Sequence, residues 1–266
     1  RRPQVVLGMG GFASGPGGLI GRVLGMPLVV HEQNAIPGMT NRWLARVATR
    51  VLEAFPGSFP VATGALAVGN PIRAEIAALP QPRPIDERRP VRLLVMGGSL
   101  GARALNEEVP ATLARMPAAD RPEVRHQTGR DKLESTREIY RRHGIEAEVT
   151  EFLDDMAAAY AWADLVVCRA GALTVSELMA AGLASVLVPF PFAVDDHQTV
   201  NARFLTEAGA AQLMPESAMD AGSLSALLQS LLGDRSRLHA MAQNAYRLAR
   251  RDAARRVADI CEELAA

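Results

Sequence analysis

Hydrophobic positions in this chain gather in short runs, each followed by a glycine-rich or polar turn and then by a segment with helical spacing. Several runs, such as 92–96 (RLLVM) and 164–168 (DLVVC), are nearly continuously apolar, which is typical of strands buried on both faces of a parallel sheet. The predicted strands are Gln4–Leu7, Pro27–His31, Arg50–Ala54, Val91–Met96, Glu123–Gln127, Glu148–Phe152, Asp164–Cys168 and Ala184–Val188.

Helical periodicity fills the segments between these runs, and this alternation predicts a doubly wound α/β fold. The C-terminal residues 234–266 predict two further amphipathic helices with an arginine-rich face. The predicted helices between the strands are Pro16–Leu24, Met39–Thr49, Ala102–Arg115, Lys132–His143, Met156–Ala163, Leu173–Ala181 and Gln198–Ala208.

A proline-rich stretch at 70–90 divides the chain. It contains five prolines and no strand pattern, so we interpret it as a surface link between two domains. Only three strand patterns precede it, fewer than an average sheet contains. We therefore expect the first domain either to be small or to lack its beginning in this sequence.

Composition and charge narrow the class of protein. The 266 residues are 48% hydrophobic and 22% charged, which excludes a disordered chain. The net charge of zero argues against a general nucleic-acid binder, and no apolar stretch of about 18 residues predicts a membrane span. Residues 1–73, however, hold seven arginines against two acidic residues, which suits a phosphate-rich or anionic-membrane partner. The two cysteines, Cys168 and Cys261, form no zinc pattern.

Two glycine-rich turns each follow a predicted strand and open a helix, at 8–18 (GMGGFASGPGG) and 97–102 (GGSLGA). Such turns let a phosphate approach the backbone, although the first is also compatible with a plain strand-to-helix connection. The second also fits the G-x-S-x-G nucleophile elbow of hydrolases, with Ser99 as the nucleophile. Its nominal partners would be Asp164 or Asp195, with His197 or His239.

A third turn, at 168–172, precedes the helix predicted from Leu173. Free N–H groups at that helix start can hold a phosphate. Glu177 lies one turn into the helix, where a carboxylate either accepts hydrogen bonds from a ribose diol or complements the helix dipole. Spacing alone does not separate these interpretations.

Polar residues also follow the strands at 27–31 and 184–188. His31, Glu32, Gln33 and Asn34 stand at the edge where open α/β sheets bind ligands, or else form a polar loop that caps a helix. The helix after them carries arginines at 42, 46 and 50, either as a solvated stripe or as a site for pyrophosphate or anionic lipid. Gln198 offers donors and an acceptor suited to sugar hydroxyls, and its segment is equally compatible with a helix cap.

Together these segments resemble the MurG family of bacterial peptidoglycan glycosyltransferases. GMGGFASGPGG, HEQN, GNPIR, GGSLGA, the 151–177 block and the Gln198 segment occur in that family's order and spacing. The resemblance implies a GT-B fold, in which two Rossmann-like domains with parallel sheets face an interdomain cleft. We expect residues 1–73, joined by a C-terminal helix at about 251–266, to form the acceptor and membrane side. Residues 74–250 would bind the donor.

The resemblance also implies the reaction. Family members move N-acetylglucosamine from UDP-GlcNAc, with inversion, to the MurNAc 4-hydroxyl of undecaprenyl-pyrophosphoryl-MurNAc-pentapeptide (lipid I), and so form lipid II. The step serves peptidoglycan synthesis, and with it cell wall biogenesis, cell shape and cell division. It requires no metal and no cofactor. A family member lies peripherally on the cytoplasmic face of the inner membrane.

Residue roles follow from the resemblance position by position. The catalytic candidates, His31 and Glu32, would lie in the cleft beside Asn34. The implied donor contacts are Asn34 for the sugar, Arg73 for the nucleotide, Ser99 for a phosphate, Leu153 for uracil, Ala172, Leu173, Thr174, Val175 and Ser176 for the diphosphate, Glu177 for the ribose and Gln198 for sugar hydroxyls.

Family members begin with a GGTGGH-type loop, whose histidine is a favoured general base and which this sequence does not contain. We therefore expect an incomplete acceptor side if these 266 residues are the whole molecule. Two alternatives stay open: an enzyme like UDP-GlcNAc 2-epimerase, which shares the GT-B architecture, and a non-catalytic subunit that binds nucleotide sugars.

Overall fold

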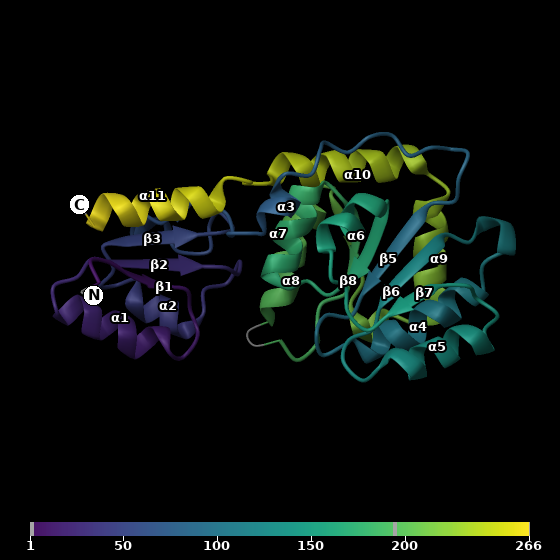
Figure 1. Ribbon diagram of the computed structural model, residues 1–266, viewed down its shortest axis with the longest axis horizontal. Helices are drawn as coiled ribbons and strands as arrows, with labels where there is room; N and C mark the ends of the chain where they lie inside the picture. Colours follow the sequence, from purple (N-terminus) through teal and green to yellow (C-terminus); the bar gives the residue numbers. More distant parts are fainter. Residues whose placement is uncertain (1–2, 194–195, 266) are drawn as a thin grey trace.

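Two parallel sheets organise the computed structural model, which describes residues 3–193 and 196–265 (Figure 1). The first sheet has the order β1-β2-β3-β4, with β1 (Val6–Gly8), β2 (Leu28–Glu32), β3 (Arg50–Glu53) and β4 (Leu66–Ala67). The second has the order β10-β9-β8-β5-β6-β7, with β5 (Arg92–Met96), β6 (Glu123–Gln127), β7 (Glu148–Thr150), β8 (Leu165–Cys168), β9 (Ala184–Leu187) and β10 (Ala211–Leu213). All eight predicted strands are present, and the α/β prediction is confirmed. The unpredicted strands, β4 and β10, are two and three residues long.

The first sheet is covered on both faces. The apolar side chains of Leu28 and Val30 pack with Leu44 of α2, whereas Val29 and Leu52 pack with Val257 of α11. Alternate residues of β2 therefore point to opposite layers, as the pleat requires. The helices here are α1 (Ser14–Val23), α2 (Met39–Leu44) and α11 (Ala253–Ala265).

Helix α2 is shorter than predicted. After Leu44 the chain turns with i to i−3 hydrogen bonds, such as Val47 N–H to Leu44 O at 3.0 Å. Thr49 N–H then donates to Leu28 O at 2.7 Å and so begins the pairing of β3 with β2. The pairing of β3 with β2 therefore determines the backbone conformation of residues 45–49, although their apolar spacing is helical.

The second sheet has two complete apolar layers. Leu93 and Val95 of β5 belong to one cluster, and Leu94 and Met96 belong to the other. This double burial explains the nearly continuous apolar run in the sequence. The surrounding helices are α3 (Ala74–Ala77), α4 (Arg103–Ala114), α5 (Leu133–Arg142), α6 (Met156–Trp162), α7 (Ala172–Ala181), α8 (His197–Glu207), α9 (Ala221–Leu232) and α10 (Arg235–Leu248), with short 3₁₀ turns η1 (Val61–Thr63), η2 (Ala118–Asp120) and η4 (Glu216–Ala218).

Two of these helices escaped the sequence analysis. Helix α9 was not predicted, and α3 lies inside the stretch that we interpreted as an irregular link. Helix α9 begins with a capping box, in which the Asp220 carboxylate accepts from Ser223 N–H and the Ser223 hydroxyl oxygen accepts from Asp220 N–H. This local start signal was present in the sequence but was not used in the prediction.

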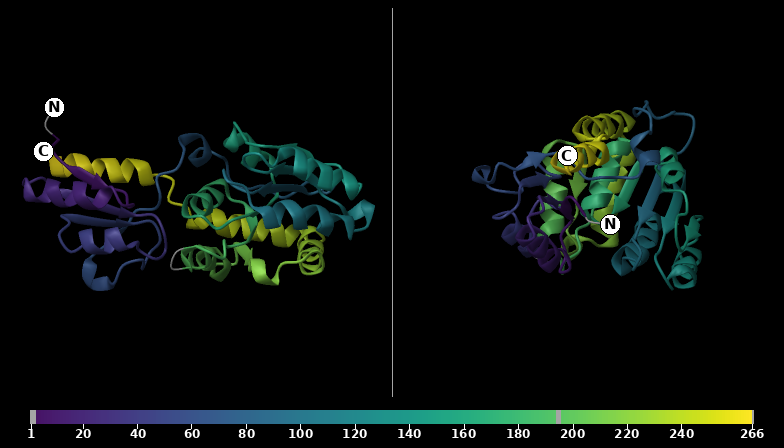
Figure 2. Two further views of the ribbon diagram at one scale, coloured as in Figure 1. Left: turned by 90° about the horizontal axis from the view of Figure 1, so that it is seen from below. Right: turned by 60° about the vertical axis from the view of Figure 1, so that its left-hand side comes forward.

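The chain passes between the two sheets twice, once after β4 and once between α10 and α11. At the crossing point Gly69 has a φ of +86°, and a Cβ there would lie 2.7 Å from the Cβ of Arg250. Arg251 anchors the return passage by donating to Ala180 O at 3.0 Å and lying over the Tyr246 ring at 3.4 Å. Figure 2 shows α10 and α11, in yellow, lying one in each half of the molecule. The division into 1–73 with 251–266, and 74–250, stays a proposal.

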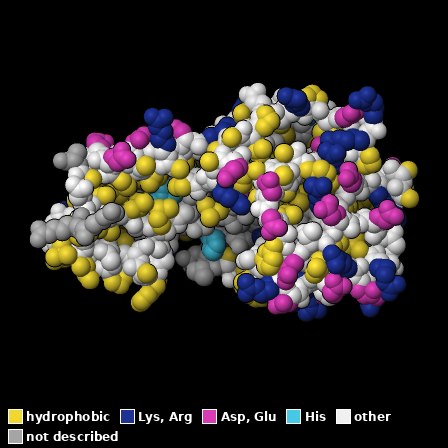
Figure 3. Space-filling view, in the orientation of Figure 1, with side chains coloured by type: hydrophobic (Ala, Val, Ile, Leu, Met, Phe, Trp, Pro, Cys, Tyr) yellow, Lys and Arg dark blue, Asp and Glu magenta, His cyan; other side chains and the backbone are white. Residues whose placement is uncertain are grey.

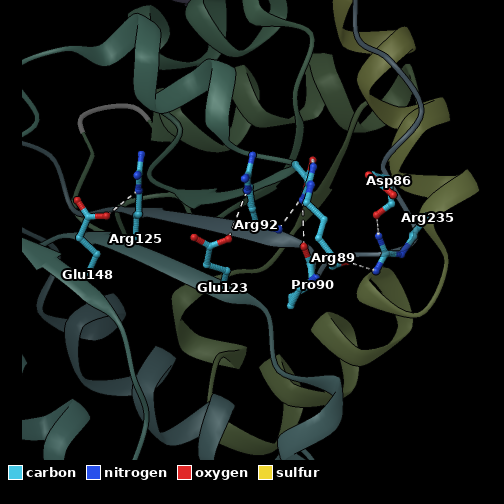
Figure 4. Close-up of polar contacts among 9 residues, drawn as sticks. Asp86, Arg89, Pro90, Arg92, Glu123, Arg125, Glu148 and Arg235 are labelled. Atoms are coloured by element: carbon cyan, nitrogen blue, oxygen red, sulfur yellow. Dashed lines mark hydrogen bonds and ion pairs between the residues drawn. The ribbon is translucent and has the colours of Figure 1, made fainter.

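Ion pairs occupy the amino ends of the strands in the second sheet (Figure 4). Arg92 pairs with Glu123 at 3.3 Å, and Arg125 pairs with Glu148 at 2.8 Å. The guanidinium of Arg125 also lies 4.3 Å from the centroid of the Trp162 ring. These contacts join neighbouring strands, and they leave the opposite, carboxyl edge as the place for a ligand.

Candidate functional site

A pocket of about 250 Å³ opens at the carboxyl ends of β5 and β8. Larger hollows, such as those of about 330 Å³ beside residues 79–85 and about 420 Å³ beside 119–122, lie away from these strand ends. The smaller pocket is the better candidate because it collects predicted residues from four separate segments. It is lined by Arg73, Met96, Gly98, Ser99, Gln127, Phe152, Leu153, Met156, Tyr160, Cys168, Arg169, Thr174 and Glu177.

The glycine-rich turn after β5 forms one wall of the pocket. Gln127 holds this turn, since its amide nitrogen donates to Gly98 O at 3.1 Å and its amide oxygen accepts from Gly98 N–H at 3.0 Å. Gly101 has a φ of +76°, and a Cβ there would lie 2.5 Å from Thr128 O. Glycine is therefore required, and the turn leaves Ser99 exposed at the pocket.

The hydrolase interpretation of this turn is wrong for Asp164. Ser99 follows β5 at the carboxyl edge, whereas Asp164 precedes β8 at the amino edge. There the carboxylate accepts from Arg89 at 2.6 and 2.9 Å, so it cannot orient a histidine beside Ser99. Asp195, the other nominal partner, lies outside the described residues.

Helix α7 begins directly beside the pocket. Its N-cap, Gly171, has extended backbone and no capping side chain, so the N–H groups of Ala172, Leu173 and Thr174 have no partner within the helix. Val175 N–H already donates to Gly171 O at 2.9 Å. The Ser176 hydroxyl donates to Ala172 O, also at 2.9 Å. Of the five residues predicted to hold a diphosphate, the first three have N–H groups without a partner inside the helix.

Glu177 is held from two sides. Its Oε1 accepts from Arg73 Nη2 at 2.9 Å and Nε at 3.2 Å, and its Oε2 accepts from the Tyr160 hydroxyl at 3.1 Å. Burial, followed by the neighbouring Glu177 carboxylate, raises the pKa of Tyr160 well above its usual value, so the phenol stays a neutral donor. The arginine is half exposed, whereas the carboxylate faces the protein interior.

His31 and Glu32 are buried at the end of β2. His31 Nε2 bonds to Gly69 O at 2.8 Å, its Nδ1 bonds to the Gln33 amide at 2.9 Å, and burial lowers its pKa. Glu32 accepts from the amides of Asn34 and Asn41 and from the backbone N–H of Asn34 and of residue 38, at 2.8–3.3 Å. These contacts favour positioning roles, and the catalytic assignment of either residue stays a prediction.

Helix α8 contributes Gln198, whose side-chain oxygen accepts from Phe190 N–H at 2.9 Å and Ala170 N–H at 3.3 Å. Asn201, three residues later, is fully buried and accepts from Ala35 N–H at 2.8 Å. It also donates to the carbonyl of Ala170 at 3.2 Å and to Asn34 Oδ1 at 3.3 Å. Gln198 thus contacts the turn before α7 directly, and Asn34 is linked to that turn through Asn201.

Sequence reasoning missed several residues in and around this site, among them Tyr160, Asn70 and Asn201. Asn70 donates to Gln33 O and to the Ser176 hydroxyl, both at 3.0 Å. Helical spacing was the available signal for Asn201, since it lies on the face of α8 that carries Gln198. Nothing local to residue 160 indicates its contact with Glu177.

Within the described residues, no group of three or more His, Cys, Asp or Glu side chains is arranged to hold a metal. The same part of the chain has no helix that is both long and apolar enough to span a membrane.

Comparison with known proteins identifies the family. Residues 92–257 match the glycosyltransferase family 28 C-terminal domain, and residues 1–53 match the corresponding N-terminal domain. A UDP-N-acetylglucosamine–N-acetylmuramyl-(pentapeptide) pyrophosphoryl-undecaprenol N-acetylglucosamine transferase from Methylococcus capsulatus is 55% identical over 263 residues. That alignment covers 99% of this chain and 73% of the relative. The chain belongs to the MurG family.

Solved structures agree with this assignment to the MurG family. The crystal structure of Acinetobacter baumannii MurG has a TM-score of 0.87 at 41% identity, over 98% of this chain and 74% of that one. The predicted GT-B fold is therefore confirmed. A Listeria monocytogenes structure assigned to the UDP-N-acetylglucosamine 2-epimerases has a TM-score of 0.67 at 15% identity, a likeness that shows the fold alone. A relative from Chromohalobacter salexigens with the same name as the Methylococcus protein is 58% identical, over 98% of this chain and 72% of its own length.

Proposed function

We propose that this chain transfers N-acetylglucosamine from UDP-GlcNAc to lipid I and so forms lipid II in peptidoglycan synthesis. The observation that carries the proposal is its identity of 53–58% to transferases of that name over 98–99% of its length. The pocket beside α7 supports it, because the start of that helix offers N–H groups without a partner inside the helix and Glu177, one turn later, offers a buried carboxylate.

In this proposal the donor lies across the carboxyl ends of β5 and β8. The N–H groups at 172–174 bind its diphosphate, Ser99 bonds one phosphate, and the backbone of Leu153 binds uracil. Glu177 accepts the ribose hydroxyls once Arg73, the exposed partner of their ion pair, turns towards the nucleotide. Asn34 and the amide nitrogen of Gln198 bind sugar hydroxyls.

Departure of UDP leaves negative charge on the diphosphate. The start of α7 stabilises that charge through oriented N–H groups and the positive end of the helix dipole, and Arg73 adds a cation. Inversion requires direct attack by the MurNAc 4-hydroxyl, and a general base contributes about 10²–10⁴-fold to such a step. His31 and Glu32 keep their place as the predicted candidates, and each contributes at least by shaping the 33–38 loop.

The first half of the molecule docks on an anionic membrane in this proposal, peripherally and on the cytoplasmic face. Apolar side chains of α1, its C-cap residue and α2 are exposed, among them Val23 at 79%, Leu24 at 70% and Trp43 at 62%. Figure 3 shows hydrophobic side chains gathered on the half with the first sheet, whereas most charged ones lie on the other. Arg46 lies 4.3 Å over the Trp43 ring, so a cation accompanies the apolar face.

A transfer assay tests the function. The protein is incubated with UDP-GlcNAc and lipid I, and the lipid product is identified by mass spectrometry. Formation of the lipid-linked disaccharide is expected. Conversion of UDP-GlcNAc to its 2-epimer without acceptor would instead identify an epimerase, and binding of UDP-GlcNAc with no product would identify a binding subunit.

A sedimentation assay with vesicles tests the docking surface. The protein should sediment with vesicles that contain anionic phosphatidylglycerol and less with purely zwitterionic ones. Replacing Val23 and Trp43 by Ser should reduce the bound fraction. Equal sedimentation of this variant and the unchanged protein would contradict the assigned surface.

A further inference from the structure

Two buried asparagines tie the loop after β2 to the turn after β8, although these belong to different sheets. Asn201 of α8 bonds to Ala35 N–H, Asn34 Oδ1 and Ala170 O at 2.8–3.3 Å. Asn70 makes a second connection, from Gln33 O to the Ser176 hydroxyl of α7. Neither asparagine lines the pocket beside α7. They therefore act on it through other residues.

On the side of the second sheet, Asn201 and Gln198 together hold both backbone groups of Ala170. Ala170 N–H donates to the Gln198 side chain, and Ala170 O accepts from Asn201. Removing Asn201 leaves the bond from Gln198 in place. The start of α7 should then keep its orientation towards a diphosphate.

On the side of the first sheet, Asn201 determines how Asn34 points. The side-chain oxygen of Asn34 accepts from Asn201, and its amide nitrogen donates to Glu32 at 3.3 Å. The carboxylate of Glu32 also accepts from Asn34 N–H at 2.9 Å. Asn34 is partly buried, and a side chain bonded at both ends in this way is held in one orientation. Loss of Asn201 frees one of those ends.

We propose that Asn201 is a positioning residue that fixes Asn34 against the donor sugar, so that recognition of the sugar depends on a side chain that does not touch it. This inference rests on the proposed function, in which Asn34 contacts that sugar. The uridine and phosphate contacts come from α7 and the pocket around it. The contact with the sugar comes from Asn34, which follows a strand of the first sheet and is held by Asn201.

Calorimetric titration with UDP and with UDP-GlcNAc separates these two parts of the donor. Asn201→Ala is expected to bind UDP within about threefold of the unchanged protein and to bind UDP-GlcNAc at least about tenfold more weakly. Asn201→Asp preserves the shape of the side chain but turns an oxygen towards Ala170 O and Asn34 Oδ1, and it serves if the alanine variant does not fold. The same selective loss is expected.

Two controls complete the test. Asn244→Asp alters an asparagine whose amide donates to Gly209 O away from the pocket, and it should change neither affinity. In an Asn34→Ala background, adding Asn201→Asp should weaken UDP-GlcNAc binding by no more than about twofold, because its target is already gone. Unchanged affinities in the Asn201 variants, or equal losses for both ligands, would overturn the inference. An unchanged protein that binds neither ligand would overturn the proposed function instead.

Discussion

Arg73 and Glu177, 104 positions apart in the chain, form a two-pronged ion pair on the wall of the candidate pocket. The carboxylate belongs to α7, and the arginine comes from the segment that has just crossed from the first sheet. A ligand that engages either residue therefore acts on the connection between the two halves as well as on the pocket.

Replacing Glu177 by Gln should weaken UDP binding by about tenfold to a hundredfold, because a neutral amide accepts less strongly from ribose hydroxyls and no longer pairs with Arg73. Calorimetry with UDP measures the change. Glu207→Gln, an exposed substitution at the end of α8, is the matched control and should bind UDP normally. Unaltered UDP affinity in Glu177→Gln would remove the carboxylate from the proposed ribose site.

Replacing Arg73 by Met should also weaken UDP binding, by about tenfold, through loss of a cation beside the proposed diphosphate site. The loss should shrink as salt is added, because a half-exposed arginine acts partly through screened attraction. Titrations at low and high ionic strength check both effects. A loss that is the same at every salt concentration would indicate that Arg73 acts only by holding Glu177.

Gly101→Ala should lower the free energy of unfolding by about 1–3 kcal/mol and weaken UDP binding, since both a positive φ and contact with Thr128 O oppose a side chain. Urea unfolding and calorimetry provide the two readouts. Gly144→Ala is the control, because residue 144 has a φ of +65° but open space around its Cβ position. It should lose only about 1 kcal/mol and retain UDP affinity. Equal losses in the two variants would show that close packing at 101 is unimportant.

Acidification should destabilise the protein through His126, a buried residue that bonds to the Tyr140 hydroxyl at 2.8 Å and to Asn106 Oδ1 at 3.0 Å. Burial lowers the pKa of His126 to about 3, so below pH 6.5 the unfolded chain binds a proton that the folded chain does not. This contribution is fully present above about pH 6.5 and is lost as the pH falls towards 3. Between pH 7 and pH 5 the loss amounts to about 2 kcal/mol.

Urea unfolding of His126→Gln at the two pH values checks this contribution. The variant should be less stable than the unchanged protein at pH 7, and its stability should depend less on pH. His143→Gln, at an exposed position, should leave the pH dependence as it was. If His126→Gln loses as much stability on acidification as the unchanged protein, another group governs the effect.

The sequence predicted the strands well because both faces of the second sheet are buried. The apolar run at 92–96 has no other stable environment than a covered sheet, and it is indeed shared between two clusters. The predicted element boundaries were wrong where tertiary contacts determine the backbone conformation, as at the end of α2. An element was missed where its apolar pattern is weak, as in the two-residue strand β4.

The residues of the candidate site were likewise predictable in part. The start of α7 could be found locally, because a strand, small residues and a helix follow one another at 165–181. The partners of Glu177 could not, since Tyr160 meets it only once α6 packs beside α7. The same holds for His31. Its Nε2 finds an internal partner only because residue 69 passes the end of β2.

The packing of α11 against β2 and β3 has a consequence for biosynthesis. Val257 completes a buried cluster with Val29, Leu52 and Val68, so the half whose strands are synthesised earlier receives its last layer from a helix made after the second sheet. The second sheet and its helices are contiguous from residue 92 to residue 248 and do not wait in this way. We expect the later-synthesised half to fold first, with the earlier one remaining a client of chaperones until α11 has been synthesised.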